Sequence, residues 1–328
     1  MPEEATTAAA DLVADLAATA ERLAGLGAVP DRLLQTHAGQ IPRDLVARLS
    51  RQVGRPPRHS GALLVRGLLA PLAAKCGPTP AHWSAAPTGP MDLALVLVAA
   101  ALGQVFGWAG QQDGRLVHNI VPSQGYENLQ VGASSSVPLE WHTEDAFHPG
   151  RASLLMLACV RNPAGVGTRI ASVRELGLPR EDLIRLGRPV VRISPDASYP
   201  ATGSGPGTTR PGVPTVWWAP DGPCLRYDPA YSTRSHDDPA FEESYRSLAE
   251  RLEQKARSVP MGAGDLALID NDVAVHGRVP FTPRYDGTDR WLKRIMVRLP
   301  SQRPEAERRE DGYGQVDIVL PTTAGAVR

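Results

Sequence analysis

The sequence predicts an α+β fold that is mainly β, with a double-stranded β-helix (jelly-roll) core and an N-terminal helical layer. Two observations lead to this prediction. Residues 1–55 carry apolar side chains at helical spacing, whereas short alternating runs between turn residues dominate from Arg115 onward. Many short strands after a helical layer are typical of jelly-roll architectures. We therefore expect a single domain over residues 1–328, with residues 1–110 as the helical layer and residues 111–300 as the core.

Four segments are predicted to be helical. In the first two, apolar residues recur every three or four positions and so line one face of a helix. The third is an unbroken apolar run after Pro90, typical of a helix buried on all sides. The fourth follows Asp238, whose side chain is expected to cap the helix, with Pro239 in the first helical position. These segments are residues 12–23, 45–49, 93–102 and 239–256.

Strand patterns fill most of the chain after Arg115. Each is a short run of aliphatic, β-branched or aromatic residues bounded by turn residues. The segment 195–214 differs because proline, glycine, serine and threonine dominate it, which leaves too few apolar side chains for a core. We expect a lid loop there, and the alternative is an insert without fixed structure. The predicted strands are residues 115–121, 153–160, 189–194, 214–219, 223–227, 265–269, 273–276 and 291–299.

Composition and charge exclude several classes of protein. Lys plus Arg and Asp plus Glu both number 35, so the zero net charge favours neither nucleic acid nor an anionic membrane as a partner. The start, Met1 to Glu4, lacks the basic and apolar regions of a signal peptide. The longest apolar run, Leu93 to Leu102, is too short to cross a membrane. Three widely spaced cysteines are expected to be reduced thiols, so we expect a cytoplasmic protein.

A His-x-Glu pair and a distant histidine match the ligand set of a non-haem iron site. His142 and Glu144 end an alternating run, so period two places both side chains on one face at the end of a strand. His276 ends a second predicted strand. Two imidazoles and one carboxylate cover one face of an octahedral Fe(II) and leave the other face for a chelating co-substrate and dioxygen. The alternative for the first pair alone is a core histidine beside a solvated glutamate.

An arginine that follows His276 in the sequence adds a second element to this pattern. Period two places Arg290, Arg294 and Arg298 on one face of the last predicted strand, and its other face is more apolar. These arginines form either a solvated stripe or the wall of an anion-binding cavity. The nearby His276 favours the cavity, in which Arg290 would hold the far carboxylate of 2-oxoglutarate through a bidentate pair.

Three ordered motifs carry a family resemblance, namely LEWHTEDAFHP at 139–149, VHGR at 275–278 and RYDGTDRWL at 284–292. With them, the sequence resembles the clavaminate synthase-like group of Fe(II)/2-oxoglutarate-dependent oxygenases. That group includes arginine and asparagine hydroxylases of peptide-antibiotic pathways. The resemblance covers about residues 90–300.

The resemblance implies a role for each residue of the metal centre. His142, Glu144 and His276 would be the iron ligands. Arg290 would bind the far carboxylate of 2-oxoglutarate, and Thr168 would assist it. The implied cofactors are Fe(II), 2-oxoglutarate as co-substrate and O2, and no catalytic residue is expected beyond the metal centre.

The resemblance also implies substrate contacts. Arg294 matches an arginine that meets the α-carboxylate of an amino-acid substrate, and Glu144 would meet its amino group. Gln111 matches a substrate-contacting glutamine, with the neighbouring Gln112 as the alternative register. Asp228 would face the far end of the substrate, and its alternative role is to form a turn.

One departure from the family pattern bears on the substrate. Relatives that act on guanidinium or carboxamide side chains carry an acidic residue two places after an aromatic-Asp pair. Here the pair is Tyr227-Asp228, and Ala230 occupies the second position. We therefore expect a side-chain pocket that is roomier and less acidic than that of an arginine hydroxylase, with free arginine a poor substrate.

The resemblance implies hydroxylation of an unactivated C–H bond, near Cβ or Cγ, of an amino acid or amino-acid derivative. The setting would be specialised metabolism such as antibiotic biosynthesis, with succinate and CO2 as co-products. Three alternatives stay open: desaturation or cyclisation at the same site, a substrate bound to a carrier protein, and a cupin-like metal-binding protein without oxygenase activity. The last alternative has no use for Thr168 together with Arg290.

Overall fold

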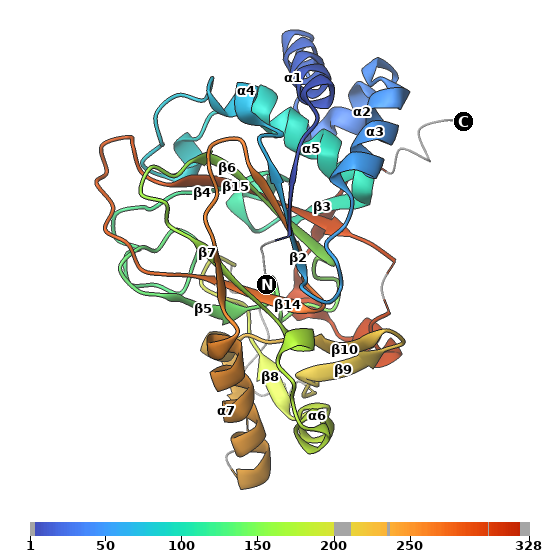
Figure 1. The fold of residues 1–328 in the computed structure, drawn as a ribbon, viewed down its shortest axis with the longest axis vertical. Coiled ribbons are helices and arrows are strands. Elements are labelled where there is room, and N and C mark those ends of the chain that lie inside the picture. The colour runs from blue at the N-terminus through green and yellow to red at the C-terminus, as the bar shows by residue number, and fades with distance from the viewer. Residues whose placement is uncertain (1–3, 200–210, 235–236, 301, 322–328) are drawn as a thin grey trace.

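The chain has a mixed, mainly β architecture in the computed structural model (Figure 1), which describes residues 4–199, 211–234, 237–300 and 302–321. Helices from the N-terminal part cover one face of a large sheet, and a smaller sheet lies on its other side. Among the helices of the described residues, none has the length and apolar character needed to cross a bilayer.

The helical layer is built around α5 (Pro90–Leu102). Most of its residues are buried because it lies between two amphipathic helices and the large sheet. Its first residue is a proline, which is pre-set for the first helical turn and follows the extended residue Gly89. The other helices of this layer are α1 (Ala10–Gly25), α2 (Leu33–Thr36), α3 (Arg43–Val53) and α4 (Ala70–Ala73).

The large sheet has eight strands in the order β1-β2-β13-β6-β15-β3-β16, with β4 also paired to β15. Only β1 and β2 are parallel neighbours within it. Alternate side chains of β15 pack on the helices (Trp291, Ile295) or toward the smaller sheet (Leu292, Met296). Its strands are β1 (Ala5–Thr7), β2 (Ala62–Arg66), β3 (Gln104–Trp108), β4 (His118–Ile120), β6 (Leu154–Arg161), β13 (Leu266–Asp270), β15 (Trp291–Arg298) and β16 (Asp317–Val319).

The smaller sheet has the order β12-β7-β14-β5 and is antiparallel throughout. Apolar side chains of both sheets, among them Leu155, Ile170 and Val275, form one buried cluster. A hairpin, a second two-stranded sheet and two helices extend this side of the molecule. The remaining elements are β5 (Leu139–His142), β7 (Thr168–Ser172), β12 (Arg257–Val259), β14 (Ala274–Arg278), β8 (Val191–Ile193) with β11 (Ser232–Arg234), β9 (Val216–Ala219) with β10 (Gly222–Leu225), α6 (Arg180–Leu186) and α7 (Pro239–Gln254).

All predicted helices and strands are present, with their ends shifted by a few residues. The N-terminal cap of α7 is confirmed, because Asp238 Oδ1 accepts a hydrogen bond from Phe241 N at 3.0 Å. Residues 1–110, predicted as a helical N-terminal layer, contain the helices α1 to α5 but also three strands. β1, β2 and β3 lie in that part of the chain and belong to the large sheet. All three pair with strands that are distant in the sequence, so no hairpin signal marks them.

The predicted lid segment 195–214 is only partly described, since residues 200–210 lie outside the described residues. Its first part ends at Tyr199, which is buried. The last part reaches Val213, whose backbone pairs with Val191.

Candidate metal and co-substrate site

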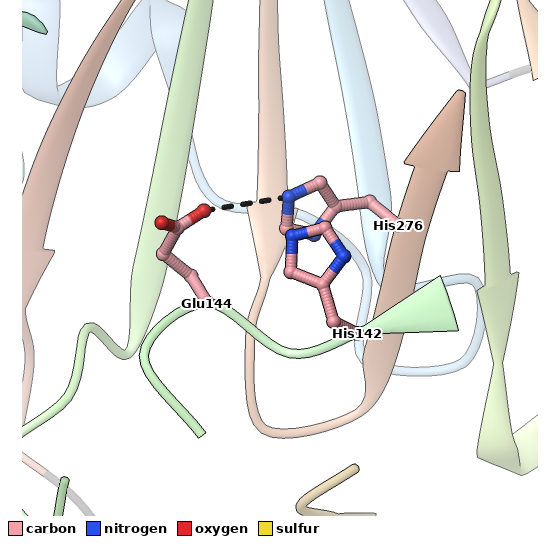
Figure 2. A group of neighbouring side chains, drawn as sticks. All are labelled: His142, Glu144 and His276. Atoms are coloured by element: carbon pink, nitrogen blue, oxygen red, sulfur yellow. Dashed lines mark ion pairs between the residues drawn. The ribbon is translucent and has the colours of Figure 1, made fainter. Parts of the chain in front are cut away.

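Two adjacent strands of the smaller sheet bring the predicted metal ligands together. His142 is the last residue of β5, and His276 lies directly opposite it in β14. Their ring centroids are 4.2 Å apart, and the carboxylate of Glu144 points toward the His276 ring (Figure 2). Each of the three residues offers one ligand atom, and these atoms all lie within 4.8 Å of one another.

The sequence pattern predicted that strand alternation brings Glu144 to the same face as His142. The structure differs, because Glu144 lies in a turn after the strand. β5 ends at His142, and Asp145 has a φ of 53°, so the chain turns sharply after Glu144. Asn271, fully buried between β13 and β14, holds this turn: its Oδ1 accepts from Glu144 N at 2.7 Å and its Nδ2 donates to Glu144 O at 3.0 Å. The sequence pattern indicated only a turn at Asn271, because its partner is distant in the chain.

The donor atoms of the cluster fit a divalent metal. His142 Nδ1 lies 2.9 Å from Glu140 O, which assigns the hydrogen to Nδ1 and leaves Nε2 free to act as a ligand. Burial and the neighbouring His276 lower the pKa of His142. Burial alone would raise the pKa of Glu144, but Arg294 and His276 outweigh it, so this pKa is lowered. Neutral imidazoles and an ionised carboxylate are the forms that bind Fe(II).

Arg290 and Thr168 form the second predicted feature of the site. Arg290 Nη2 donates to Thr168 Oγ1 at 3.1 Å, across the space between the two sheets. Arg290 is 8% exposed, and its Nε has no partner among the described residues. Burial lowers the pKa of Arg290 to about 10. A buried cation with free donors is the arrangement that a carboxylate ligand satisfies.

The metal cluster and this arginine open into one cavity of about 100 Å³ between the sheets. The alternative of a solvated arginine stripe is therefore wrong for Arg290 and Arg294, both of which line the cavity. Arg298, further along β15, instead pairs with Asp317 near the surface. The residues that line the cavity include His142, Glu144, His276, Thr168, Arg278, Arg290, Arg294, Asp196, Asp228 and Ala230.

Arg294 connects the cavity to the residues predicted for substrate binding. Its guanidinium forms an ion pair with Glu144 and donates to Gln111 Oε1 at 2.8 Å. It also lies 2.6 Å from His118 Nδ1, and burial together with this arginine lowers the pKa of His118 to about 3. The neighbouring Gln112 bonds instead to the backbone of Asn119, so of the two glutamines it is Gln111 that contacts Arg294.

The substrate end of the cavity carries the residues of the aromatic-Asp pattern. Asp228 follows β10 and lines the cavity, as does Ala230, which occupies the position where the family pattern was expected to have a second acid. Burial raises the pKa of Asp228 to about 7, although the nearby His142 opposes the shift. Asp196 lines the same cavity, and its charge also raises the pKa of Asp228.

The described start of segment 195–214 contacts the loop that carries Glu144. Trp108 Nε1 donates to Asp145 Oδ2 at 2.6 Å, and the hydroxyl of Tyr199 donates to Asp145 Oδ1. Phe147 packs edge-on against Tyr199, with ring centroids 4.8 Å apart, and edge-on against Tyr313, with ring centroids 5.8 Å apart. The loop that carries Glu144 is thus supported by residues from four separate parts of the chain, namely Trp108, Tyr199, Asn271 and Tyr313.

Comparison with known proteins agrees with this geometry. The model of the taurine catabolism dioxygenase TauD, TfdA family matches residues 91–296. An L-ornithine/L-arginine 3-hydroxylase from Catenulispora acidiphila is 36% identical over 68% of this chain and 72% of its own. An enduracididine beta-hydroxylase from Streptomyces hygroscopicus is 34% identical over 80% of this chain and 83% of its own.

Solved structures give the same result. The non-heme iron oxygenase OrfP, in complex with Fe, succinate and (3S)-hydroxy-L-Arg, superposes with a TM-score of 0.76 and 35% identity, covering 90% of this chain and 94% of its own. The resemblance predicted from the three motifs is confirmed. The family match spans most of the chain, including the metal cluster and Arg290. The chain belongs to the TauD/TfdA family of dioxygenases.

Proposed function

We propose that this protein is an Fe(II)/2-oxoglutarate-dependent hydroxylase of an α-amino acid. One observation carries the proposal: a His-Glu-His cluster and a buried arginine–threonine pair open into the same cavity. His142, Glu144 and His276 would hold Fe(II), and Arg290 with Thr168 would hold the far carboxylate of 2-oxoglutarate. When bound, the metal and co-substrate supply the oxidising chemistry, which consumes O2 and gives succinate, CO2 and a hydroxylated substrate.

The protein's own residues bind and orient the amino acid. Arg294 lies at the cavity wall with Glu144 on one side and Gln111 on the other. In the proposed complex, Arg294 pairs with the α-carboxylate and Glu144 accepts from the α-amino group, so a zwitterion replaces their mutual ion pair. A fixed pair of charges at one end of the substrate positions the adjacent Cβ and Cγ hydrogens toward the metal.

The charge of the cavity favours a cationic side chain on that amino acid. Asp196, Asp228 and Glu140 all line the cavity, and none of them forms an ion pair within the described residues. Asp196 supplies a carboxylate near Asp228 at the end where Ala230 lacks one. Hydroxylases of ornithine or arginine, enduracididine and lysine among the relatives act on substrates of this charge type.

We also propose that residues 1–328 form one oxygenase domain with a double-stranded β-helix core and that the protein acts in the cytoplasm. The two facing sheets with a shared apolar cluster support the first statement. All three cysteines are unpaired, as expected of a reducing compartment.

The test is a substrate panel. The full chain, loaded with Fe(II) under ascorbate, is incubated with 2-oxoglutarate and with ornithine, lysine, arginine, asparagine and their derivatives. We expect a product 16 mass units heavier from a cationic amino acid, with one succinate formed per product. Succinate formation that no amino acid stimulates would overturn the assignment of a free amino-acid substrate.

A further inference from the structure

Arg278 is a buried arginine for which the proposed function has no role. It lies in β14, two residues after His276, and is 3% exposed. Its Nη2 donates to Ser134 Oγ at 2.9 Å and to Val137 O at 3.3 Å. Within the described part of the chain, Nε and Nη1 have no hydrogen-bond partner, and no carboxylate neutralises the charge.

The position of Arg278 places it beside the co-substrate pair. In the register of β14 and β7, Arg278 is directly opposite Thr168. Side chains that face each other in this way have Cβ atoms about 5 Å apart. Thr168 Oγ1 accepts from Arg290 Nη2 at 3.1 Å, and all three residues line the same cavity. Thr168 therefore has Arg278 opposite it in the adjacent strand and the guanidinium of Arg290 bonded to its hydroxyl, and the charge of Arg290 acts on Arg278.

This arrangement has an electrostatic cost that only an anion relieves. Two buried like charges repel each other, and each has given up its hydration. Arg290 also has no carboxylate partner among the residues that the structure describes. A ligand carboxylate located near Thr168 Oγ1 would neutralise the repulsion and satisfy the free donors of both arginines.

We propose that Arg278 is a second cationic contact for the far carboxylate of 2-oxoglutarate, so that Arg278, Arg290 and Thr168 form one two-arginine site. The proposal rests on the proposed function, because it takes 2-oxoglutarate as the co-substrate. Scaffold contacts alone do not explain the residue. Ser134 and Val137 occupy only Nη2, and Phe281, with its ring centroid 4.9 Å from Cζ, fixes the guanidinium without satisfying a donor.

The test compares two ligands by calorimetry on the Fe(II)-loaded full chain without oxygen. One ligand is 2-oxoglutarate, and the other is 2-oxopentanoate, which has a methyl group in place of the far carboxylate. Arg278→Gln should weaken 2-oxoglutarate binding roughly 10- to 100-fold, the effect of losing charge-assisted hydrogen bonds in a buried site. Binding of 2-oxopentanoate should not change. Arg278→Lys should recover part of the loss because it keeps the charge.

Controls separate binding from folding. Ser134→Ala removes the anchor of Arg278 but keeps its charge, so it should weaken 2-oxoglutarate binding less than Arg278→Gln does. Iron content and melting temperature of each variant check the fold. The inference is overturned if Arg278→Gln binds 2-oxoglutarate as tightly as the unmodified chain, if both ligands weaken equally, or if only amino-acid binding suffers. An unmodified chain that fails to bind 2-oxoglutarate would instead refute the proposed function.

Discussion

Replacing Asn271 with aspartate should impair metal binding although Asn271 is not a ligand. The side chain is fully buried, and its amide makes three hydrogen bonds. Oδ1 accepts from Glu144 N, and Nδ2 donates to Glu144 O and Ala152 O, both at 3.0 Å. Aspartate has the same shape but no donor, so an oxygen would face two carbonyl oxygens.

The magnitude follows from these contacts. Each lost hydrogen bond costs about 1 kcal/mol, and a buried carboxylate without a partner adds more, so we expect a loss of about 3–5 kcal/mol in unfolding free energy. Because the same contacts fix the backbone of Glu144, metal affinity should fall roughly 10- to 100-fold, the usual effect of removing a group that orients a ligand.

The assay pairs urea unfolding with Fe(II) retention measured without oxygen. Asn162→Asp is the matched control. Asn162 makes the same pattern of bonds, accepting from Val166 N at 3.0 Å and donating to Val166 O and Met261 O, but it does not line the cavity. Asn162→Asp should cost stability and leave iron affinity unchanged. A folded Asn271→Asp chain that retains iron like the unmodified protein would refute the reasoning.

Four further predictions test the site and the fold. His142→Ala or His276→Ala should abolish turnover and iron retention while the circular dichroism spectrum is preserved, and unchanged iron content in either variant would rule out the ligand assignment. Arg290→Ala should weaken 2-oxoglutarate binding by about 2–5 kcal/mol with iron still bound, as for other truncated buried charge pairs; an unchanged Michaelis constant for 2-oxoglutarate would contradict this. Arg294→Ala should raise the Michaelis constant of the amino acid far more than that of 2-oxoglutarate, and equal increases would argue against a substrate contact. Burial alone would raise the pKa of Glu307, but the buried Arg151 and Arg226 lower it. The ionised Glu307 therefore stabilises the fold above the unfolded pKa of about 4.3, and this stabilisation is lost as the pH falls below that value. Glu307→Gln should lower stability at pH 7 and flatten the acid limb of a stability–pH curve, whereas an unaltered acid limb would show that other groups control it.

The metal centre was largely predictable from sequence, and the physical reason is the chemistry of its side chains. His142 and His276 end recognisable strand patterns, and Arg290 begins another, so their types and order were enough. Asn271 was not predictable because its bonds to Glu144 join residues 127 positions apart and use only backbone atoms of the partner. No local pattern encodes such a contact.

The role of Arg278 was hidden for a different reason. Its motif was visible, but its significance depends on which strand lies beside it, and β7 had no strong sequence signal. β1 and β3 also lack a strong sequence signal, and they are recognised as strands only because they pair with distant strands. Composition and periodicity thus indicate elements, whereas the partners of each element come from the three-dimensional structure.

The position of β15 has a consequence for how the protein is made. This strand comes late in the chain, yet it is hydrogen-bonded to β6 on one side and to β3 and β4 on the other, so the middle of the large sheet is filled late. Until then, a growing chain on the ribosome carries β6 with an unpaired apolar edge, which readily joins other chains. Arg294 arrives with this strand, and Arg290 directly precedes it. A product truncated before Trp291 is therefore expected to be an aggregation-prone fragment, not a weakened enzyme.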